Sequence, residues 1–318
     1  MLHRRGADHP GMSRAWAAAA LVVVLWASAF AAIRAALAGF TATELSVLRL
    51  ALASVALALA AAFIRPRRPA LKDLPAVVAA GATGMTAYQL LLNTGERTVT
   101  AGTASLLVST GPIFVALLAA ATLGERLNRR ERLGLAVAFA GALVIALGQG
   151  GGVTLSGGAL IVLAAAVSQA AFFVIQKPLL ARYSAFEVTT YSMWAGTVLI
   201  LPLGAHLPHA VIHAHAEPLI AVAVLALGAS AIGFFAWAFA SARVPIARLS
   251  ASLYAVPVVA ILVALVWLGE LPSIASITGG AIALTGVAIT SGYTYRRESS
   301  GRIRPRRGGS RRGRRAVV

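Results

Sequence analysis

Hydrophobic residues occur along this chain in long stretches, separated by short polar and basic segments. A helix needs roughly 20 apolar residues to cross a bilayer, and lipid cannot satisfy an exposed backbone. The pattern predicts ten membrane-spanning helices, at residues 15–38, 44–64, 75–93, 101–122, 131–148, 157–180, 187–206, 217–239, 246–268 and 272–292. The predicted fold class is therefore an all-α polytopic membrane protein.

A set of residues occurs twice in the same order, 145 positions apart. The first copy comprises Pro112, Leu123, Gly124, Glu125, Gly134 and Gly141, and the second comprises Pro257, Leu268, Gly269, Glu270, Gly279 and Gly286. Further upstream the spacing is 143, and Trp26, Phe30, Arg34, Leu37 and Glu44 align with Gln169, Phe173, Lys177, Leu180 and Glu187. The chain is predicted to contain two repeats, at 15–148 and 157–292, joined by a loop at 149–156.

Five helices in each repeat is an odd number, so the second repeat is predicted to be inverted in the membrane relative to the first. The loops after the two Gly-Glu pairs agree, because residues 126–132 contain four arginines whereas residues 271–276 contain no basic residue. Inverted repeats suit a transporter, since two equivalent halves that exchange conformations open a central site to each side in turn.

Lys and Arg residues are distributed unevenly between the two predicted sides, and short basic loops stay cytoplasmic during insertion. With the N-terminus inside, the basic segments 1–14, 65–72 and 126–132 lie inside, whereas the opposite loops contain Arg97 alone. Both termini are therefore predicted to be cytoplasmic. The high Ala, Gly and Arg content with the basic tail suggests a bacterial source, and hence the inner (plasma) membrane. We expect the Arg-rich tail at 293–318 to be disordered and to associate with anionic lipid.

The N-terminal segment has an alternative interpretation. Arg4, Arg5 and Arg14 precede an apolar run that ends near Ala27-Ser28-Ala29, which resembles a secretory signal with its cleavage site. The repeat partner of this run at 157–180 favours a retained helix, because cleavage would destroy the symmetry.

Composition agrees with a membrane protein, since 59% of the residues are hydrophobic, only 12% are charged and the mean hydropathy is +0.82. The absence of cysteine excludes disulfides, thiolate metal ligands and cysteine catalysis. No nucleophile with a base, metal triad or phosphate-binding motif stands out, so we expect no enzyme activity and no cofactor. Any driving energy should then come from an ion gradient or the solute gradient.

Several motifs are specific in combination through their order, spacing and duplication. They are Trp26-Ala27-Ser28-Ala29-Phe30, Arg49, Tyr88-Gln89 through Thr94, Ala101-Gly102-Thr103-Ala104-Ser105, Pro112, Gly124-Glu125-Arg126 and Gly134. The chain resembles the EamA family of the drug/metabolite transporter superfamily in these motifs, over about residues 15–292. The resemblance implies a ten-helix inner-membrane carrier, often an exporter of small metabolites, with a central cavity. The second copy departs from the pattern at Arg248 and Leu249, which stand where the first has Thr103 and Ala104.

Polar side chains inside the apolar helices are the candidates for solute binding, because each is costly in lipid. They are Trp26, Tyr88, Gln89, Asn93, Gln169 and Tyr254. Gln89 and Asn93 lie one turn apart with amides that donate and accept, and Trp26 aligns with Gln169 on a matching wall. Hydrogen bonding between helices is the alternative for these residues, and interface anchoring is the alternative for the aromatic ones.

Four charged residues near helix ends are candidates for gating or coupling, namely Arg34, Arg49, Glu44 and Glu187. We expect Arg34 and Arg49 at an outer vestibule, with snorkelling to the interface as the alternative. Glu44 and Glu187 open equivalent helices, where an interaction with the helix dipole is the alternative to proton coupling.

The duplicated motif predicts structural roles. Pro112 and Pro257 are expected to interrupt their helices, to free a carbonyl and to form a hinge. The Gly-Glu pairs, Gly124-Glu125 and Gly269-Glu270, follow these helices, where the carboxylate is expected to accept backbone amides and fix a tight connection.

Two surface features carry weaker hypotheses. His206, His209, His213 and His215 fall in a predicted outer loop, where His209 and His213 have metal-ligand spacing if helical, but a solvated loop without metal is favoured. The basic tail lacks an aromatic platform, so no nucleic-acid binding is expected. The sequence does not indicate an oligomeric state.

These patterns together predict a secondary transporter that exports a small polar organic metabolite, amino-acid-like or drug-like, by alternating access between inverted repeats. A membrane-embedded scaffold or sensor without transport is one alternative, and an uptake permease is another. The expected partners are a small-molecule solute and the lipid bilayer.

Overall fold

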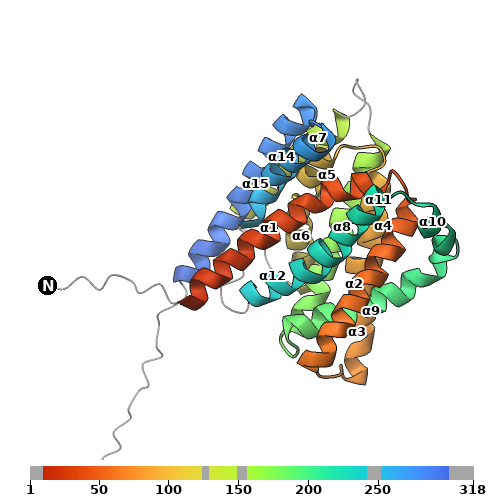
Figure 1. Cartoon of the computed structure of the whole chain (residues 1–318). Helices are drawn as coiled ribbons and strands as arrows, with labels where there is room; N and C mark the ends of the chain where they lie inside the picture. The colour runs from red at the N-terminus through yellow and green to blue at the C-terminus, as the bar shows by residue number, and fades with distance from the viewer. Residues whose placement is uncertain (1–9, 124–128, 149–155, 242–251, 301–318) are drawn as a thin grey trace, which may run out of the picture.

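A computed structural model of the 318-residue chain describes residues 10–123, 129–148, 156–241 and 252–300 (Figure 1). Within these ranges the regular structure is helical, and no strand occurs. The first half contains α1 (Pro10–Ala36), α2 (Ala42–Ile64), η1 (Leu71–Asp73), α3 (Leu74–Ala80), η2 (Gly81–Ala87), α4 (Tyr88–Gly95), α5 (Ala101–Val108), α6 (Gly111–Leu123) and α7 (Arg129–Leu147). The second half contains α8 (Gly157–Leu180), α9 (Ala185–Ile200), η3 (Leu201–Gly204), α10 (Leu207–His213), α11 (Ala216–Ala223), η4 (Val224–Ile232), α12 (Gly233–Ser241), η5 (Leu253–Ala255), α14 (Val256–Leu268) and α15 (Ile274–Ser300).

The apolar helices fall where the sequence predicts them but differ in length. Five described segments are long and apolar enough to cross a bilayer, namely Ser13–Ala36, Ala42–Ile64, Leu71–Gly95, Gly157–Leu180 and Ala216–Trp237. A sixth candidate, Ala185–Gly204 with Leu207–His213, is bent by 82°. The other apolar helices are shorter, at 10–17 residues, and comprise Ala101–Val115, Arg132–Ile145, Val256–Leu268 and Ile274–Gly286. Length and composition therefore support five or six spans.

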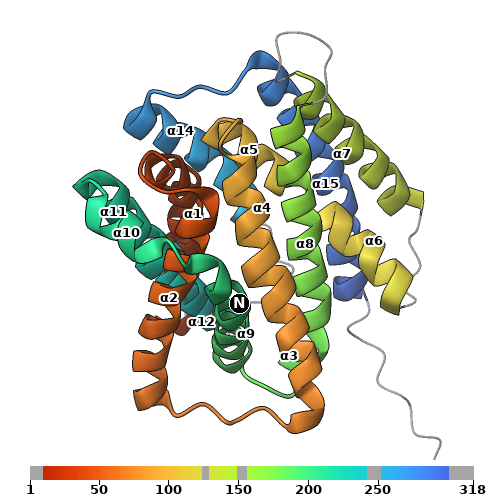
Figure 2. The ribbon, with the colours of Figure 1, turned by 90° about the vertical axis from the view of Figure 1, so that its right-hand side faces the viewer.

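The two halves pack across each other rather than side by side. α1 contacts α12 and α14 of the second half, and α8 contacts α4 and α6 of the first half. Figure 2 shows α8 lying between α4 and α6. The first helix of each repeat is thus held by the third and fourth helices of the other repeat.

The last helices of the two repeats, α7 and α15, form a close contact through glycine. A Cβ at Gly141 would lie 2.5 Å from the carbonyl oxygen of Gly279, and a Cβ at Gly286 would lie 2.5 Å from that of Gly134. The four positions are the repeat-related glycines, so one contact becomes the other when the halves are exchanged. Small residues allow helix backbones to approach in lipid, where dispersion and not hydrophobicity drives packing.

Each third helix contains a π-helical turn, η2 in one repeat and η4 in the other. A π-helical turn releases carbonyls from the i to i+4 pattern, and a side chain from the opposite repeat uses one of them in each case. Trp26 of α1 donates from Nε1 to the carbonyl of Ala229 at 3.1 Å, and Ser168 of α8 donates from Oγ to the carbonyl of Thr83 at 2.9 Å.

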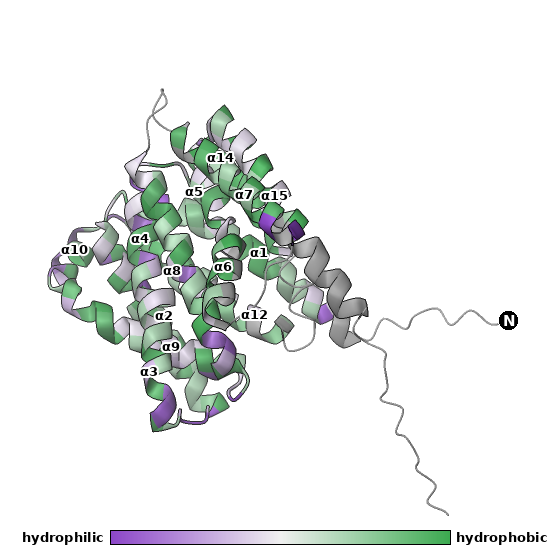
Figure 3. Cartoon of the chain, turned by 180° about the vertical axis from the view of Figure 1, so that it is seen from behind, coloured by the Kyte–Doolittle hydropathy of each residue, from purple (hydrophilic) through white to green (hydrophobic). Residues whose placement is uncertain are grey.

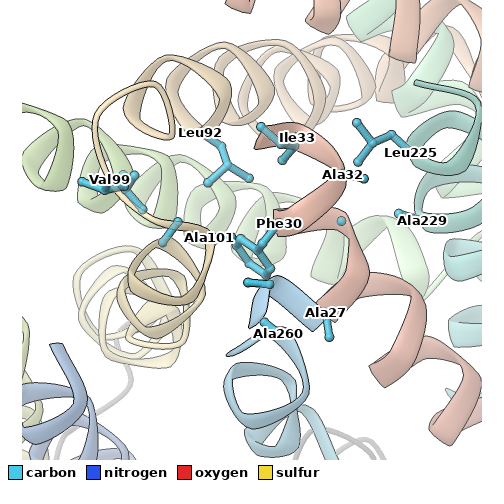
Figure 4. Packing of buried hydrophobic residues seen from close by; sticks show 14 of the residues in the cluster. Ala27, Phe30, Ala32, Ile33, Leu92, Val99, Ala101, Leu225, Ala229 and Ala260 are labelled. Atoms are coloured by element: carbon cyan, nitrogen blue, oxygen red, sulfur yellow. The ribbon is translucent and has the colours of Figure 1, made fainter. Parts of the chain in front are cut away.

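The largest buried cluster lies between the two repeats. Figure 4 shows Phe30 and Ile33 of α1 beside Leu92, Ala101 and Ala260, with Leu225 on the other side of α1. Figure 3 shows hydrophobic residues along most of the helices and hydrophilic residues near the start of α3, and large apolar side chains such as Phe63 and Val266 are exposed. Apolar side chains thus fill the centre and also face outward, as expected for a protein whose solvent is lipid.

The structure adjusts three expectations about helix ends. The predicted helices at 101–122 and 246–268 are each divided just before the proline, since α5 ends at Val108 and η5 ends at Ala255. Pro112 and Pro257 are each the second residue of the helix that follows, α6 or α14, where no backbone N–H is needed, and their role as hinges stays a prediction. α15 continues to Ser300, eight residues into the predicted disordered tail at 293–318, and α1 begins at Pro10. Helical hydrogen bonding can extend beyond the apolar segment, because water also satisfies the last turns.

Candidate functional site

Polar side chains from α1, α2, α4 with the residue after it, η4 and the connection between α14 and α15 meet near the C-terminal end of α1. We call this set the polar layer, and it comprises Arg34, Ser46, Arg49, Gln89, Asn93, Glu96, Ser230 and Glu270. Five of its residues were selected from the sequence, and of these Arg49, Gln89 and Asn93 are buried whereas Arg34 and Glu270 are partly exposed. The layer joins segments of both repeats.

Arg34 links the two repeats directly. Its Nε and Nη2 contact Oε1 of Glu270 at 3.0 Å and 2.9 Å, while its Nη1 donates to the carbonyl of Glu96 at 2.7 Å. The guanidinium lies in a fork between a carboxylate and a backbone carbonyl, which suits its rigid, planar donor geometry. The side chains of Arg34 and Glu270 are 29% and 20% exposed, so the pair is only partly shielded from solvent.

The second Gly-Glu pair has a defined geometry. Gly269 ends α14 in the left-handed region, with a φ of 66°, and its N–H donates to the carbonyl of Leu265. Glu270 accepts the N–H of Ala101 through Oε2 at 3.2 Å. The carboxylate therefore accepts a backbone amide, as the sequence suggested, but that amide begins α5 in the other repeat. The first pair, Gly124 and Glu125, lies outside the described residues.

Arg49 is buried in the middle of the layer, with 5% of its surface exposed. Its Nε donates to Oγ of Ser230 at 3.1 Å, and its Nη1 donates to Oε1 of Gln89 at 2.9 Å. The alternative of snorkelling to the interface is therefore wrong for Arg49, because neutral acceptors in the interior hold the guanidinium. Both of these hydrogen-bond partners are neutral, so they do not neutralise the charge of Arg49.

The next polar positions of α4 contain unsatisfied acceptors. Asn93 donates from Nδ2 to Oγ of Ser46 at 2.8 Å, but its Oδ1 has no partner. Glu96 is fully buried, and neither of its carboxylate oxygens has a hydrogen-bond partner. Sequence reasoning missed Glu96, which lies just beyond the predicted span at 75–93. The spacing of Gln89, Asn93 and Glu96 by four and three residues was the signal that could have found it.

Trp26 and Gln169 each contact the opposite repeat. The Trp26 ring packs on Phe234 and Trp237, with both pairs of ring centroids 5.5 Å apart. The Gln169 side chain lies within hydrogen-bonding reach of the Tyr88 hydroxyl. Helix-to-helix hydrogen bonding, the alternative for this pair, is thus present for both residues, since Trp26 also donates to the Ala229 carbonyl of η4. Solute contact stays a prediction.

Glu44 and Glu187 occupy equivalent positions at the start of α2 and α9. Each closes a capping box, in which Glu44 accepts the N–H of Thr41 at 2.8 Å and Glu187 accepts that of Ser184 at 2.7 Å. Glu187 also accepts the N–H of Arg67 at 2.8 Å. These contacts give both carboxylates a local role at the helix N-terminus, and proton coupling through them stays a prediction.

Two further predicted features are placed by the structure. The backbone of Tyr254 lies in η5, and its side chain is outside what the structure describes. His209 and His213 lie on α10 rather than in a loop, with ring centroids 4.2 Å apart. Among the described residues, no group of three or more His, Asp or Glu side chains is placed to hold a metal ion.

The fold and the polar layer define a class of protein: a multi-pass helical membrane protein built of two similar, mutually packed repeats. The model of the EamA-like transporter family matches residues 14–147 and again residues 156–292. The chain belongs to the EamA-like transporter family.

Similar proteins agree with this assignment. A protein of Streptantibioticus cattleyicolor, named "Probable terminal-alkyne amino-acid exporter", is 49% identical over 291 residues, which cover 91% of this chain and 98% of that relative. The "Uncharacterized transporter YdfC" of Bacillus subtilis is 37% identical, over 85% of this chain and 88% of its own length. A "Probable amino-acid metabolite efflux pump" of Salmonella typhimurium is 29% identical over 62% of this chain and 70% of its own length.

One solved crystal structure matches with a TM-score of 0.60 and covers 90% of this chain and 99% of its own chain. The two sequences are 22% identical, so this likeness concerns the fold alone.

Proposed function

We propose that this protein is a secondary transporter that exports a small, amino-acid-like metabolite by alternating access between two inverted five-helix repeats. The observation that carries the proposal is the crossed packing, in which α1 and α8 each lie against helices of the opposite repeat. A rearrangement of one first helix must therefore change the contacts between the halves. The names of two relatives support export, since one is called an amino-acid exporter and the other an amino-acid metabolite efflux pump.

The polar layer supports a zwitterionic solute. Arg49 provides a cation suited to a carboxylate, while the unpaired Oδ1 of Asn93 provides an acceptor suited to an ammonium group. We propose that Trp26, Tyr88, Gln89, Asn93, Gln169 and Tyr254 line the solute path. Removing Trp26 or Gln169 should then impair transport more than it impairs folding.

The distribution of basic residues supports the proposed orientation. Arg65, Arg67, Arg68 and Lys72 lie between α2 and α3, so the positive-inside rule puts this connection in the cytoplasm. We propose ten spans in two inverted sets of five in the inner membrane, with both termini on its cytoplasmic side. The Arg34–Glu270 pair then lies at the outer end of α1 and closes that end in the conformation described.

Counterflow in proteoliposomes tests the function. Vesicles loaded with an unlabelled pool of amino acids, including one with a terminal-alkyne side chain, should accumulate a labelled member of the pool through the wild-type protein. Trp26→Ala and Gln169→Ala should abolish this accumulation, whereas Phe63→Ala, a change at an 88% exposed ring, should not. A scaffold or sensor would give no accumulation with any solute, and the proposal would then be wrong.

A further inference from the structure

Glu96 is a buried carboxylate whose side chain has no partner, although its backbone is fully engaged. Its N–H donates to the carbonyl of Leu92 at 2.9 Å, and its own carbonyl accepts Nη1 of Arg34 at 2.7 Å. The residue is 0% exposed, and both Oε atoms lack a hydrogen bond. An ionised carboxylate in this state loses its hydration without compensation, which is among the most costly arrangements in a protein.

The charged groups around Glu96 come from three other segments. Arg34 on α1 and Arg49 on α2 act on it with positive charge, and Glu270 after α14 acts with negative charge. The two arginines already donate to other acceptors, Arg34 to Glu270 and Arg49 to Gln89 and Ser230.

The next residue in the chain, Arg97, is also charged but its side chain is exposed, and α8 packs here through uncharged residues. Gly158 and Val162 of α8 lie against Gly95, the residue before Glu96. On its own helix the titratable neighbour is Tyr88, two turns away. Because Arg34 and Glu270 form an ion pair, Arg49 is the cation that remains to offset the charge of an ionised Glu96.

Protonation would change the hydrogen-bonding capacity of this corner. A protonated carboxyl has an O–H to donate, whereas an ionised one can only accept. The nearest position on the same face of the helix, three residues earlier, is Asn93, whose Oδ1 is a buried acceptor without a donor. A neutral Glu96 therefore supplies the kind of group that this corner lacks. The guanidinium of Arg49 keeps its neutral acceptors, Gln89 and Ser230, in that state.

We propose that Glu96 is a proton-binding site, which holds a proton while the end of the molecule around Arg34 and Glu270 is closed and releases it when that end opens. On opening, the O–H bond of the carboxyl breaks, its electron pair stays on the carboxylate, and the proton passes to water. The carboxylate then becomes hydrated and lies near Arg34, which has lost Glu270. The only species exchanged is a proton.

The surroundings of Glu96 shift its pKa in the direction that the proposal requires. Burial raises the pKa of the Glu96 carboxyl well above its ordinary value, and the charges of Arg34 and Arg49 act in the opposite sense. Glu96 lies immediately after the Leu71–Gly95 span. Because the closed state binds the proton more tightly than the hydrated, open state, low pH favours closure. Closure should be lost as the pH rises from the ordinary carboxyl pKa to the raised one.

The first test needs no solute, so it is independent of the proposed function. Only a coupling of this proton to solute transport would rest on that function. Infrared spectra of the full-length protein in lipid nanodiscs, recorded over a pH titration, should show the carbonyl stretch of a buried protonated carboxylic acid. Glu96→Gln should lack this band, and Glu217→Gln, at an exposed carboxylate on α11, should retain it. A spectrum in which the wild type and Glu96→Gln are identical would overturn the proposal.

A second measurement links the proton to the conformation. Spin labels at Thr94→Cys and Leu271→Cys, both at exposed positions, report the distance between the end of α4 and the connection after α14. The long-distance population should grow as the pH rises, and Glu96→Gln should remove this dependence. Glu96→Asp keeps an acid and should keep a displaced pH response, which separates proton binding from misfolding. An unchanged pH response in Glu96→Gln would refute the link.

These outcomes are distinguishable from failure of the proposed function. If no solute shows counterflow but the infrared band and the pH-dependent distance both depend on Glu96, the proton site stands and the transport assignment falls. If counterflow occurs without either signal, the reverse holds.

Discussion

Gly141 of α7 and Gly279 of α15 are in backbone contact across the two halves: a Cβ on Gly279 would lie 2.7 Å from the carbonyl oxygen of Gly141. Both residues belong to the duplicated motif, and their partners Gly134 and Gly286 repeat the contact further along the same helices. Any side chain at these positions must push two backbones apart.

Gly141→Leu should therefore separate α7 from α15 and lower the melting temperature of the purified protein. Overpacking of a tight contact costs about 1–3 kcal/mol. Gly157→Ala provides the matched control, because nothing lies within 4 Å of the added Cβ at the start of α8. Equal melting temperatures for Gly141→Leu and the control would contradict this packing.

Trp26→Phe should destabilise the protein by about 1 kcal/mol, because it leaves the Ala229 carbonyl without its donor while most of the ring is kept. Ser168→Ala should have a similar effect in the other repeat, where it removes the donor to Thr83. Thermal unfolding in the same detergent measures both. A large loss for one variant and none for the other would show that the two contacts are not equivalent.

Arg34→Gln and Glu270→Gln should each favour opening at the end of α1. Either change removes one charge of a partly shielded pair and leaves the other unpaired, and a tenfold population shift corresponds to about 1.4 kcal/mol. The distance between labels at Thr94→Cys and Leu271→Cys reports this opening. Arg67→Gln is the control, since it affects a charge that is 75% exposed in another part of the protein. If neither variant lengthens the distance, the pair does not hold this end closed.

Arg49→Lys should reduce counterflow by roughly tenfold or more, although it preserves the charge. A lysine presents a single ammonium and cannot reproduce the planar fork that reaches both Gln89 and Ser230. Initial rates in proteoliposomes with matched protein content measure the effect. Wild-type rates in Arg49→Lys would show that charge alone is required.

Cysteine labelling in intact cells tests the proposed orientation, and the natural chain contains no cysteine to remove first. A membrane-impermeant thiol reagent should label Glu217→Cys at the start of α11, on the proposed outer side. It should leave Lys72→Cys, on the proposed cytoplasmic side, unlabelled until the cells are permeabilised. Both side chains are exposed, so access depends on the side of the membrane. The opposite labelling pattern would invert the proposed topology.

The sequence predicted the repeat and the membership of the family because both depend on patterns along the chain. The offsets of 143 and 145 paired Glu44 with Glu187 and Gly141 with Gly286, and the structure gives each pair equivalent surroundings. Local signals were sufficient here, since a capping box is set by residues three positions apart.

Contacts across the repeats could not be predicted in the same way. Arg34 and Glu270 are 236 positions apart, and both were interpreted separately, one as a vestibule residue and the other as part of a connection. Their meeting depends on how α1 crosses α14, which no periodicity along a single helix contains. Glu96 was overlooked for a related reason, because a carboxylate beside Arg97 at the end of an apolar segment has the pattern of a solvated loop.

The crossed arrangement also constrains how the chain is made. α1 is the first helix to leave the ribosome, yet α12 and α14, which cover much of its surface, are synthesised near the end. Phe30 and Ile33 must therefore remain in contact with lipid or with the insertion machinery until the second half has been inserted. A nascent chain that stops after α7 contains a first helix without its partners, and a ribosome that stalls there leaves a substrate for membrane proteases rather than a folded half.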